Sequence, residues 1–170
     1  SAARPLGRRG AAEQVGVPGF HMGGWWDHHH DGQCETYAGI RDRGASQAAR
    51  EGQRMMMGPW GHSTFGARGE AHRSYGQWDF GQQADVSTHL QAMRFLNLHL
   101  RDHDDGITEE PPVHVFLMGA NRWLHLPDWP APDAQEQSWF LHSTGHADGR
   151  GGPGSLSLET PDDEPADSFV

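Results

Sequence analysis

The sequence contains no lysine: all 13 basic residues are arginine, whereas Asp and Glu together number 23. The net charge of −10 argues against nucleic-acid binding, because an acidic surface repels phosphate backbones. The single cysteine, Cys34, excludes an internal disulfide framework and leaves the compartment open, with the cytoplasm slightly favoured. No apolar run is long enough for a membrane-spanning helix. The first residue is not Met, and we expect the chain to be cut from a longer one.

The acidic residues are unevenly distributed. Residues 102–170 hold 14 of the 23 acidic residues and only 2 of the 13 arginines. Such a shift in composition predicts a domain boundary near Asp102. The acidic segment that follows is typical of a solvated linker.

The pattern of the first hundred residues predicts alternating strands and helices. Val15–Met22 and Gln53–Met57 are short apolar runs that end at glycines, which predicts two buried strands. Gln33–Arg43 is a plausible helix between them. The polar segment from Trp60 to about Gln83 predicts a long loop, and a loop of that length in a compact domain is usually functional.

Asp85–Arg101 gives the strongest helix signal, because Val86, Leu90, Met93 and Leu100 follow the 3.6-residue period. That stripe predicts a face packed in the core. After residue 112 the pattern changes to short strand-like runs separated by Gly- and Pro-rich turns, which is all-β spacing. The runs are Val113–Met118, Ser138–Leu141 and Ser155–Leu158.

Asp27 and His62 each follow one of the two predicted strands. In an open α/β sheet, active sites lie outside the carboxyl ends of the strands. A carboxylate that orients a histidine is two thirds of an acyl-transfer triad, and α/β-hydrolases present the acid before the histidine along the chain. Asp27 precedes His62 by 35 residues, a separation that fits one helical crossover between neighbouring strands.

The motifs around these residues resemble a known family. VPGFHMGGWWD, then GPWGHS, then PPVHVFLMGANRWLHLPDWP are similar to segments of the cocaine esterase, X-prolyl dipeptidyl aminopeptidase and glutaryl acylase family. The resemblance implies an α/β fold, with the C-terminal part of an α/β-hydrolase domain at 1–105, a linker at 106–112 and the start of an all-β jelly-roll at 113–170. It also makes Asp27 the triad acid and His62 the triad base.

By this resemblance the parent enzyme is a serine hydrolase that cleaves an ester or amide bond, Xaa-Pro dipeptidyl bonds included, through an acyl-enzyme. Its substrate would be a small-molecule ester or amide or a peptide, and no cofactor is implied. The nucleophile elbow G-x-S-x-G does not occur in this sequence. We expect it upstream, together with the cap and the oxyanion-hole tyrosine.

The acid is followed by three consecutive histidines, His28–His30, where family members often carry an apolar or aromatic residue. With that departure, the acyl pocket is expected to be more polar. The substrate-pocket candidates are Trp25, Trp26, His29 and Trp60.

Two alternatives remain at this stage. One is a metal-dependent hydrolase that uses the His28–His30 cluster, although adjacent side chains do not easily converge on one ion. The other is a non-catalytic β-sandwich that binds sugar or protein through exposed tryptophans. The oligomeric state and the particular substrate are not indicated by the sequence.

Overall fold

The computed structural model describes residues 11–63, 70–147, 152 and 154–167. The chain divides into two compact units, residues 1–132 and 133–170. No helix in these described segments is long and apolar enough to cross a membrane.

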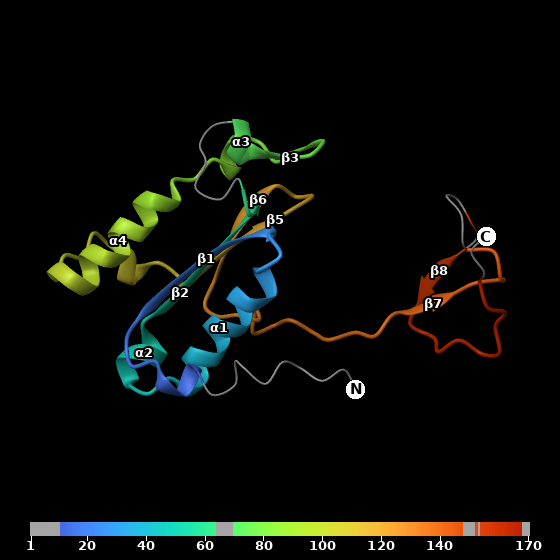
Figure 1. Ribbon diagram of the computed structural model, residues 1–170, viewed down its shortest axis with the longest axis horizontal. Coiled ribbons are helices and arrows are strands. Elements are labelled where there is room, and N and C mark those ends of the chain that lie inside the picture. The colour runs from blue at the N-terminus through green and yellow to red at the C-terminus, as the bar shows by residue number, and fades with distance from the viewer. Residues whose placement is uncertain (1–10, 64–69, 148–151, 153, 168–170) are drawn as a thin grey trace. The chain divides into compact units, whose positions relative to one another are not determined.

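Unit 1 is built on a four-stranded sheet (Figure 1). Its strands are β1 (Gly19–Trp26), β2 (Gln53–Gly61), β5 (Val113–Leu117) and β6 (Arg122–Leu126), in the order β1-β2-β5-β6. The first three are parallel, and β6 is antiparallel to β5. All but one of the residues in β2 are buried, which is typical of a parallel strand covered on both faces.

Helix α1 (His30–Arg43) crosses from β1 to β2 and covers one face of the sheet. Its Tyr37 is fully buried against Met55 and Met57 of β2 and Val113 of β5. Because side chains alternate along a strand, the odd-numbered residues of β2 form this core. A short helix, α2 (Gln47–Glu51), leads into β2, and the Ser46 hydroxyl caps it by accepting a hydrogen bond from the Ala49 N–H.

Helix α4 (Thr88–Arg101) lies on the other face, where Phe95 packs against Phe20 of β1 with ring centroids 5.6 Å apart. The prediction that its apolar stripe is in the core is wrong. Leu90, Met93 and Leu100 are exposed, because the helix turns the opposite face, with Phe95, toward the sheet.

The segment predicted as a loop between Trp60 and Gln83 contains regular structure. Residues 64–69 lie outside the described part of the chain. Beyond them come α3 (Glu70–Arg73), the hairpin strands β3 (Ser74–Tyr75) and β4 (Trp78–Asp79), and a 3-10 turn, η2 (Gln82–Ala84). The hairpin turns at Gly76, whose positive φ of 59° suits glycine.

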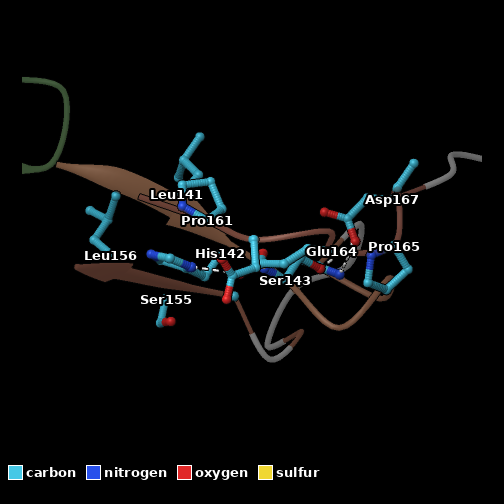
Figure 2. A pocket seen from close by; sticks show the side chains of 13 residues that line it. Leu141, His142, Ser143, Ser155, Leu156, Pro161, Glu164, Pro165 and Asp167 are labelled. Carbon is cyan, nitrogen blue, oxygen red and sulfur yellow. Dashed lines mark hydrogen bonds and ion pairs between the residues drawn. The ribbon is translucent and has the colours of Figure 1, made fainter. Parts of the chain in front are cut away.

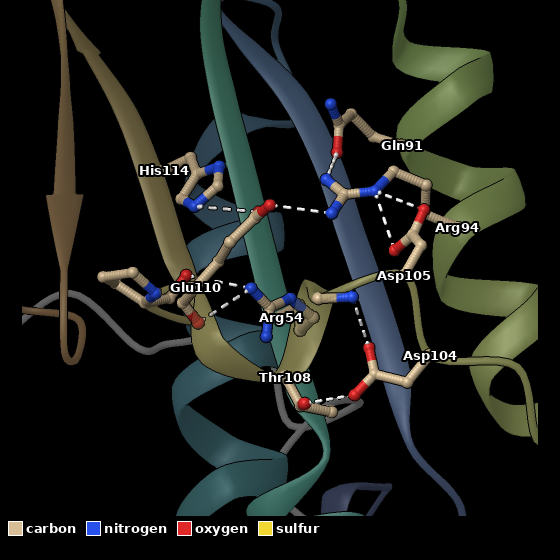
Figure 3. Close-up of polar contacts among 10 residues, drawn as sticks. Arg54, Gln91, Arg94, Asp104, Asp105, Thr108, Glu110 and His114 are labelled. Atoms are coloured by element: carbon tan, nitrogen blue, oxygen red, sulfur yellow. Dashed lines mark hydrogen bonds and ion pairs between the residues drawn. The ribbon is translucent and has the colours of Figure 1, made fainter.

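Residues 102–112, predicted to be a solvated linker, contact the rest of unit 1 at several points (Figure 3). Ile107, in the 3-10 turn η3 (Ile107–Glu109), is 2% exposed. Arg94 of α4 bonds Asp105 at 2.9 Å and Glu110 at 2.7 Å. These charge-assisted hydrogen bonds raise the pKa of Arg94 and hold the segment against the helix.

We expect Arg94→Met to lower the free energy of unfolding by about 2 kcal/mol, the usual contribution of hydrogen bonds to charged groups. Urea denaturation followed by circular dichroism measures the change. Arg101→Met, at an exposed position of the same helix, is the matched control and should stay within about 0.5 kcal/mol of the unsubstituted chain. Equal effects of the two substitutions would show that the Arg94 contacts are not stabilising.

The jelly-roll prediction began at residue 113, but β5 and β6 belong to the sheet of unit 1. In unit 2 the described residues form one antiparallel pair, β7 (Phe140–His142) with β8 (Ser155–Ser157). Leu141 and Leu156 of this pair are exposed. The described part of unit 2 is therefore all-β, and its completion to a jelly-roll remains a prediction.

Candidate functional site

Asp27 and His62 lie side by side at the carboxyl ends of β1 and β2. These strands are neighbours in the sheet, and Trp26 is in register with Gly61. Each candidate residue directly follows one of that pair. The His62 Nδ1 is 3.0 Å from the Asp27 Oδ2, which is hydrogen-bonding distance. The structure thus brings together the two residues that the sequence singled out.

Asp27 is 8% exposed, and both of its carboxylate oxygens contact donors. The His29 backbone N–H donates to Oδ1 at 2.9 Å. The His28 Nδ1 is 3.5 Å from the same oxygen. Burial by itself would raise the pKa of Asp27, but these hydrogen bonds and the neighbouring imidazoles outweigh burial and lower it below its usual value. The carboxylate is therefore ionised at neutral pH.

An ionised carboxylate only accepts hydrogen bonds, so the contact between Asp27 and His62 places the proton on the His62 Nδ1. In a neutral imidazole this leaves the lone pair on Nε2, the nitrogen that a general base uses in an acyl-transfer triad. The His62 side chain is 64% exposed. His62 thus exposes Nε2, which can accept a proton, while its Nδ1 is hydrogen-bonded to the buried Asp27 carboxylate.

The sequence builds this arrangement through glycines at the strand ends. The chain turns sharply after β1, where the Asp27 N–H donates to the Gly24 carbonyl at 3.0 Å. A Cβ at Gly24 would lie 2.0 Å from the Trp60 carbonyl oxygen. Only glycine allows β1 and β2 to approach this closely just before the two functional side chains.

The four predicted pocket residues fall into two groups. Trp25 and Trp60 act in packing: their indole N–H groups donate to the carbonyls of Phe116 and Ala84, and Trp60 is 1% exposed. Trp26 and His29 are exposed next to Asp27. Their positions therefore suit substrate contact, whereas those of Trp25 and Trp60 do not.

Tyr75 is a site residue that the sequence reasoning missed. Its ring stacks on Trp26 with centroids 5.1 Å apart and an interplanar angle of 12°. It also covers Gly61, where an added Cβ would lie 2.3 Å from the tyrosine ring. No local motif marks Tyr75; its place depends on how the β3–β4 hairpin folds over the end of β2.

Histidines that follow the ends of two neighbouring strands gather around the same carboxylate. Asp27, His28, His29 and His62 each offer a ligand atom, and these four atoms lie within 4.8 Å of one another. His30 has turned away: its Nδ1 contacts the Asp27 backbone carbonyl and its Nε2 contacts Asp31. The cluster therefore differs from the consecutive His28–His30 set considered from the sequence.

Unit 2 contains a second set of serine, histidine and carboxylate residues, near a cavity of about 750 Å³ (Figure 2). The His142 Nδ1 is 2.6 Å from Glu164, and its Nε2 is 2.9 Å from the Ser157 hydroxyl. However, Nε2 also lies 3.1 Å from the Glu159 carbonyl, which only accepts. The bond to Glu164 raises the pKa of His142. A carboxylate faces Nδ1 and a carbonyl oxygen faces Nε2, so both ring nitrogens are placed to donate rather than to take a serine proton. We therefore interpret this set as a link between β7 and the segment after β8.

Two family profiles match the chain. Residues 4–64 match the X-Pro dipeptidyl-peptidase (S15 family) profile. Residues 105–169 match the C-terminal non-catalytic domain of X-Pro dipeptidyl-peptidases. The Asp27 and His62 motifs both lie within the first match, and the two matches follow the order of an α/β-hydrolase part and a β part.

Individual relatives agree with these profiles. Cocaine esterase of Rhodococcus sp. strain MB1 is 28% identical over 156 residues, covering 92% of this chain and 25% of the esterase. A candidate serine esterase of Mycobacterium bovis is 35% identical over 114 residues, covering 62% of this chain and 17% of the relative. The chain thus spans a quarter or less of these relatives.

A solved structure supports the fold. An aminopeptidase from a marine sediment archaeon of the Thaumarchaeota superimposes with a TM-score of 0.58 at 22% identity, over 89% of this chain and 22% of the aminopeptidase. At this identity the similarity shows the fold alone. The two profile matches, which together span most of the chain, and the esterase relatives show that the chain belongs to the X-Pro dipeptidyl-peptidase (S15) and cocaine esterase family.

Proposed function

We propose that this chain supplies the acid and the base of a serine hydrolase triad, Asp27 and His62, to a nucleophilic serine outside the 170 residues. The observation that carries the proposal is the 3.0 Å contact between the buried carboxylate and the exposed imidazole. Its place at the carboxyl ends of parallel strands is where α/β enzymes locate their chemistry.

The proposed reaction is hydrolysis of an ester or amide through an acyl-enzyme. His62 Nε2 removes the proton of the serine hydroxyl as the oxygen attacks the carbonyl, and returns it to the leaving group. Asp27 holds the imidazole in the tautomer that keeps Nε2 available and stabilises the imidazolium once it forms. Water then repeats the sequence on the acyl-enzyme.

Trp26 and Tyr75 are proposed to form an aromatic wall of the substrate site. Both are partly exposed, at 41% and 36%, and their rings are stacked. Trp26 directly precedes Asp27. Tyr75 covers Gly61, which directly precedes His62. The face of an aromatic ring can pack against a benzoyl group or a proline ring, just as it packs against another aromatic ring. The wall is therefore compatible with ester and Xaa-Pro substrates alike and does not distinguish them.

The proposal also explains why several large apolar side chains are exposed in this chain. The stripe Leu90, Met93 and Leu100 on α4 is the kind of surface that a further part of a hydrolase domain would cover. Leu141 and Leu156 would likewise be covered in a complete jelly-roll.

We place the start of that jelly-roll after Pro132, because β5 and β6 are hydrogen-bonded within the hydrolase sheet.

Labelling with a fluorophosphonate probe, which reacts only with an activated serine, tests the proposal. The 170-residue chain alone should remain unlabelled, because its serines are not in a nucleophile elbow. A polypeptide that joins the upstream coding sequence to this chain should be labelled and should hydrolyse p-nitrophenyl esters or Xaa-Pro p-nitroanilides. Labelling of the chain alone, or none of the joined polypeptide, would refute the proposal.

A further inference from the structure

Three histidines and one carboxylate converge where the proposed mechanism needs one histidine. The ring centroids of His28 and His62 are 4.8 Å apart, and those of His29 and His62 are 5.5 Å apart. His28 and His29 follow the end of β1 and His62 follows the end of β2. An acyl-transfer triad leaves the two additional imidazoles without a role.

We propose that Asp27, His28, His29 and His62 form a binding site for a divalent transition metal such as Zn²⁺, and that the bound ion inhibits hydrolysis. The inhibition rests on the proposed function of His62, whereas the binding does not. The metal would be a regulator that occupies the catalytic pair rather than a cofactor of the reaction.

The geometry lies within reach of tetrahedral coordination. Zinc binds imidazole nitrogen at about 2.0–2.1 Å, so two ligand atoms on one ion are about 3.3 Å apart. The four atoms here already lie within 4.8 Å of one another. His28 and His62 are 67% and 64% exposed, so their rings can rotate inward without disturbing the core.

Asp27 supplies the fixed point of the site. Its carboxylate is buried and held by the His29 backbone N–H, as ligands in metal sites are commonly held by outer hydrogen bonds. The imidazoles of His28 and His62 already face it at 3.5 Å and 3.0 Å. A cation among them would take the place of the proton that His62 donates to Asp27.

The donor set selects the kind of ion. Three neutral imidazoles and one carboxylate suit Zn²⁺, Cu²⁺ or Ni²⁺, while Mg²⁺ and Ca²⁺ prefer oxygen ligands alone. An imidazole bound to a metal has given its lone pair to the ion and is fixed in position. His62 could then neither accept the serine proton nor rotate toward the substrate.

Zinc binding is measured on the full 170-residue chain, prepared without a histidine tag and stripped with EDTA, by competition with a chromophoric chelator. We expect one Zn²⁺ per chain, with no displacement by millimolar Mg²⁺. His28→Gln, His29→Gln and His62→Gln should each weaken the affinity by at least about tenfold, the lower end of what loss of an outer-shell partner costs. Circular dichroism checks that each variant is folded, which their exposed positions favour.

His30→Gln and His103→Gln are the matched controls. His30 belongs to the same run but points away, and His103 is exposed beyond α4. Both variants should bind zinc within about twofold of the unsubstituted chain, well below the effect of losing a ligand. An affinity unchanged in the His28, His29 and His62 variants, or reduced equally by His30→Gln, would overturn the site.

The inhibitory role has its own readout in the polypeptide that includes the nucleophile. Zinc should abolish ester hydrolysis at the concentration that saturates the chelator assay, and EDTA should restore it. Zinc bound at these residues with hydrolysis unchanged would keep the site and overturn the inhibition. Absence of zinc binding, with activity still lost in His62→Gln, would overturn the site and leave the proposed function standing.

Discussion

Replacing His62 with Ala in a polypeptide that also carries the nucleophile should lower kcat/KM by about 10⁴-fold or more, the scale observed for triad histidines. The physical reason is the loss of the imidazole that is hydrogen-bonded to the buried Asp27 carboxylate and presents a proton-accepting nitrogen. Because the His62 side chain is mostly exposed, the substitution should leave folding intact.

Asp27→Asn provides the complementary variant. The amide keeps the shape of the carboxylate but can donate to Nδ1, which stabilises the tautomer whose lone pair is on the wrong nitrogen. Its loss of kcat should approach about 10⁴-fold, as for the equivalent change in other triads. Steady-state hydrolysis of a p-nitrophenyl ester measures both variants, with His103→Ala, at an exposed position beyond α4, as the control.

The control matters because the chain has 13 histidines. If His62→Ala lowered activity no more than His103→Ala, the base would have to be another residue. If His62→Ala removed activity but Asp27→Asn did not, the imidazole would be oriented by some other group. Either result would disprove the Asp27–His62 pair as the catalytic unit, although the family membership would stand.

The pair itself was predictable from the sequence, because its signals are local. A buried parallel strand is a short apolar run, and the run before each residue is visible in the sequence. The structure extends both strands, to Trp26 and to Gly61, so that Asp27 and His62 follow directly. The parallel pairing that the prediction assumed is present, and the distance between the side chains is a consequence of it.

Two other features could not be predicted, for different reasons. The 3.6-residue period of α4 shows that the helix has two unlike faces but not which one meets the sheet. The buried residues of the helix are Thr88 and Phe95, and Phe95 lies on the less apolar face. Tyr75 reaches Trp26 only through the folding of a hairpin from a distant part of the chain. Long-range contacts of this kind leave no periodic pattern in the sequence.

The cluster of His28, His29 and His62 is a third feature that the sequence did not predict. From the sequence, three consecutive histidines were unfavourable for one ion because neighbouring side chains point in different directions. In the structure the chain turns after β1, so His28 and His29 lie together, with ring centroids 4.0 Å apart. The remaining histidine, His62, follows the end of β2, and the pairing of β1 with β2 brings it near.

Replacing Gly24 with Ala should remove most or all of the stability of unit 1. The added Cβ would lie 2.0 Å from the Trp60 carbonyl oxygen and 2.5 Å from its carbonyl carbon. Both are backbone atoms of a buried strand and cannot rotate away. Relief therefore requires separating β1 from β2, with a cost of about 4–5 kcal/mol or more, the range of the most damaging single substitutions.

Gly23→Ala is the matched control, one residue earlier in the same strand. There the nearest atoms are the Met57 sulfur at 3.2 Å and a side-chain carbon of Gln33 at 3.3 Å. Both belong to flexible side chains that can shift by a few tenths of an ångström, so we expect a loss of about 1 kcal/mol, the usual effect of a point substitution. Urea denaturation monitored by tryptophan fluorescence compares the two variants.

A large loss for Gly24→Ala beside a small one for Gly23→Ala would show that backbone contact, rather than glycine content, sets the spacing of β1 and β2. The same spacing fixes the distance between Asp27 and His62, since each residue follows the end of one strand. If Gly24→Ala were as stable as Gly23→Ala, the strands could separate at little cost. The hydrogen bond between the proposed acid and base would then depend on something other than the sheet, and the close approach at Gly24 could not be what positions the catalytic pair.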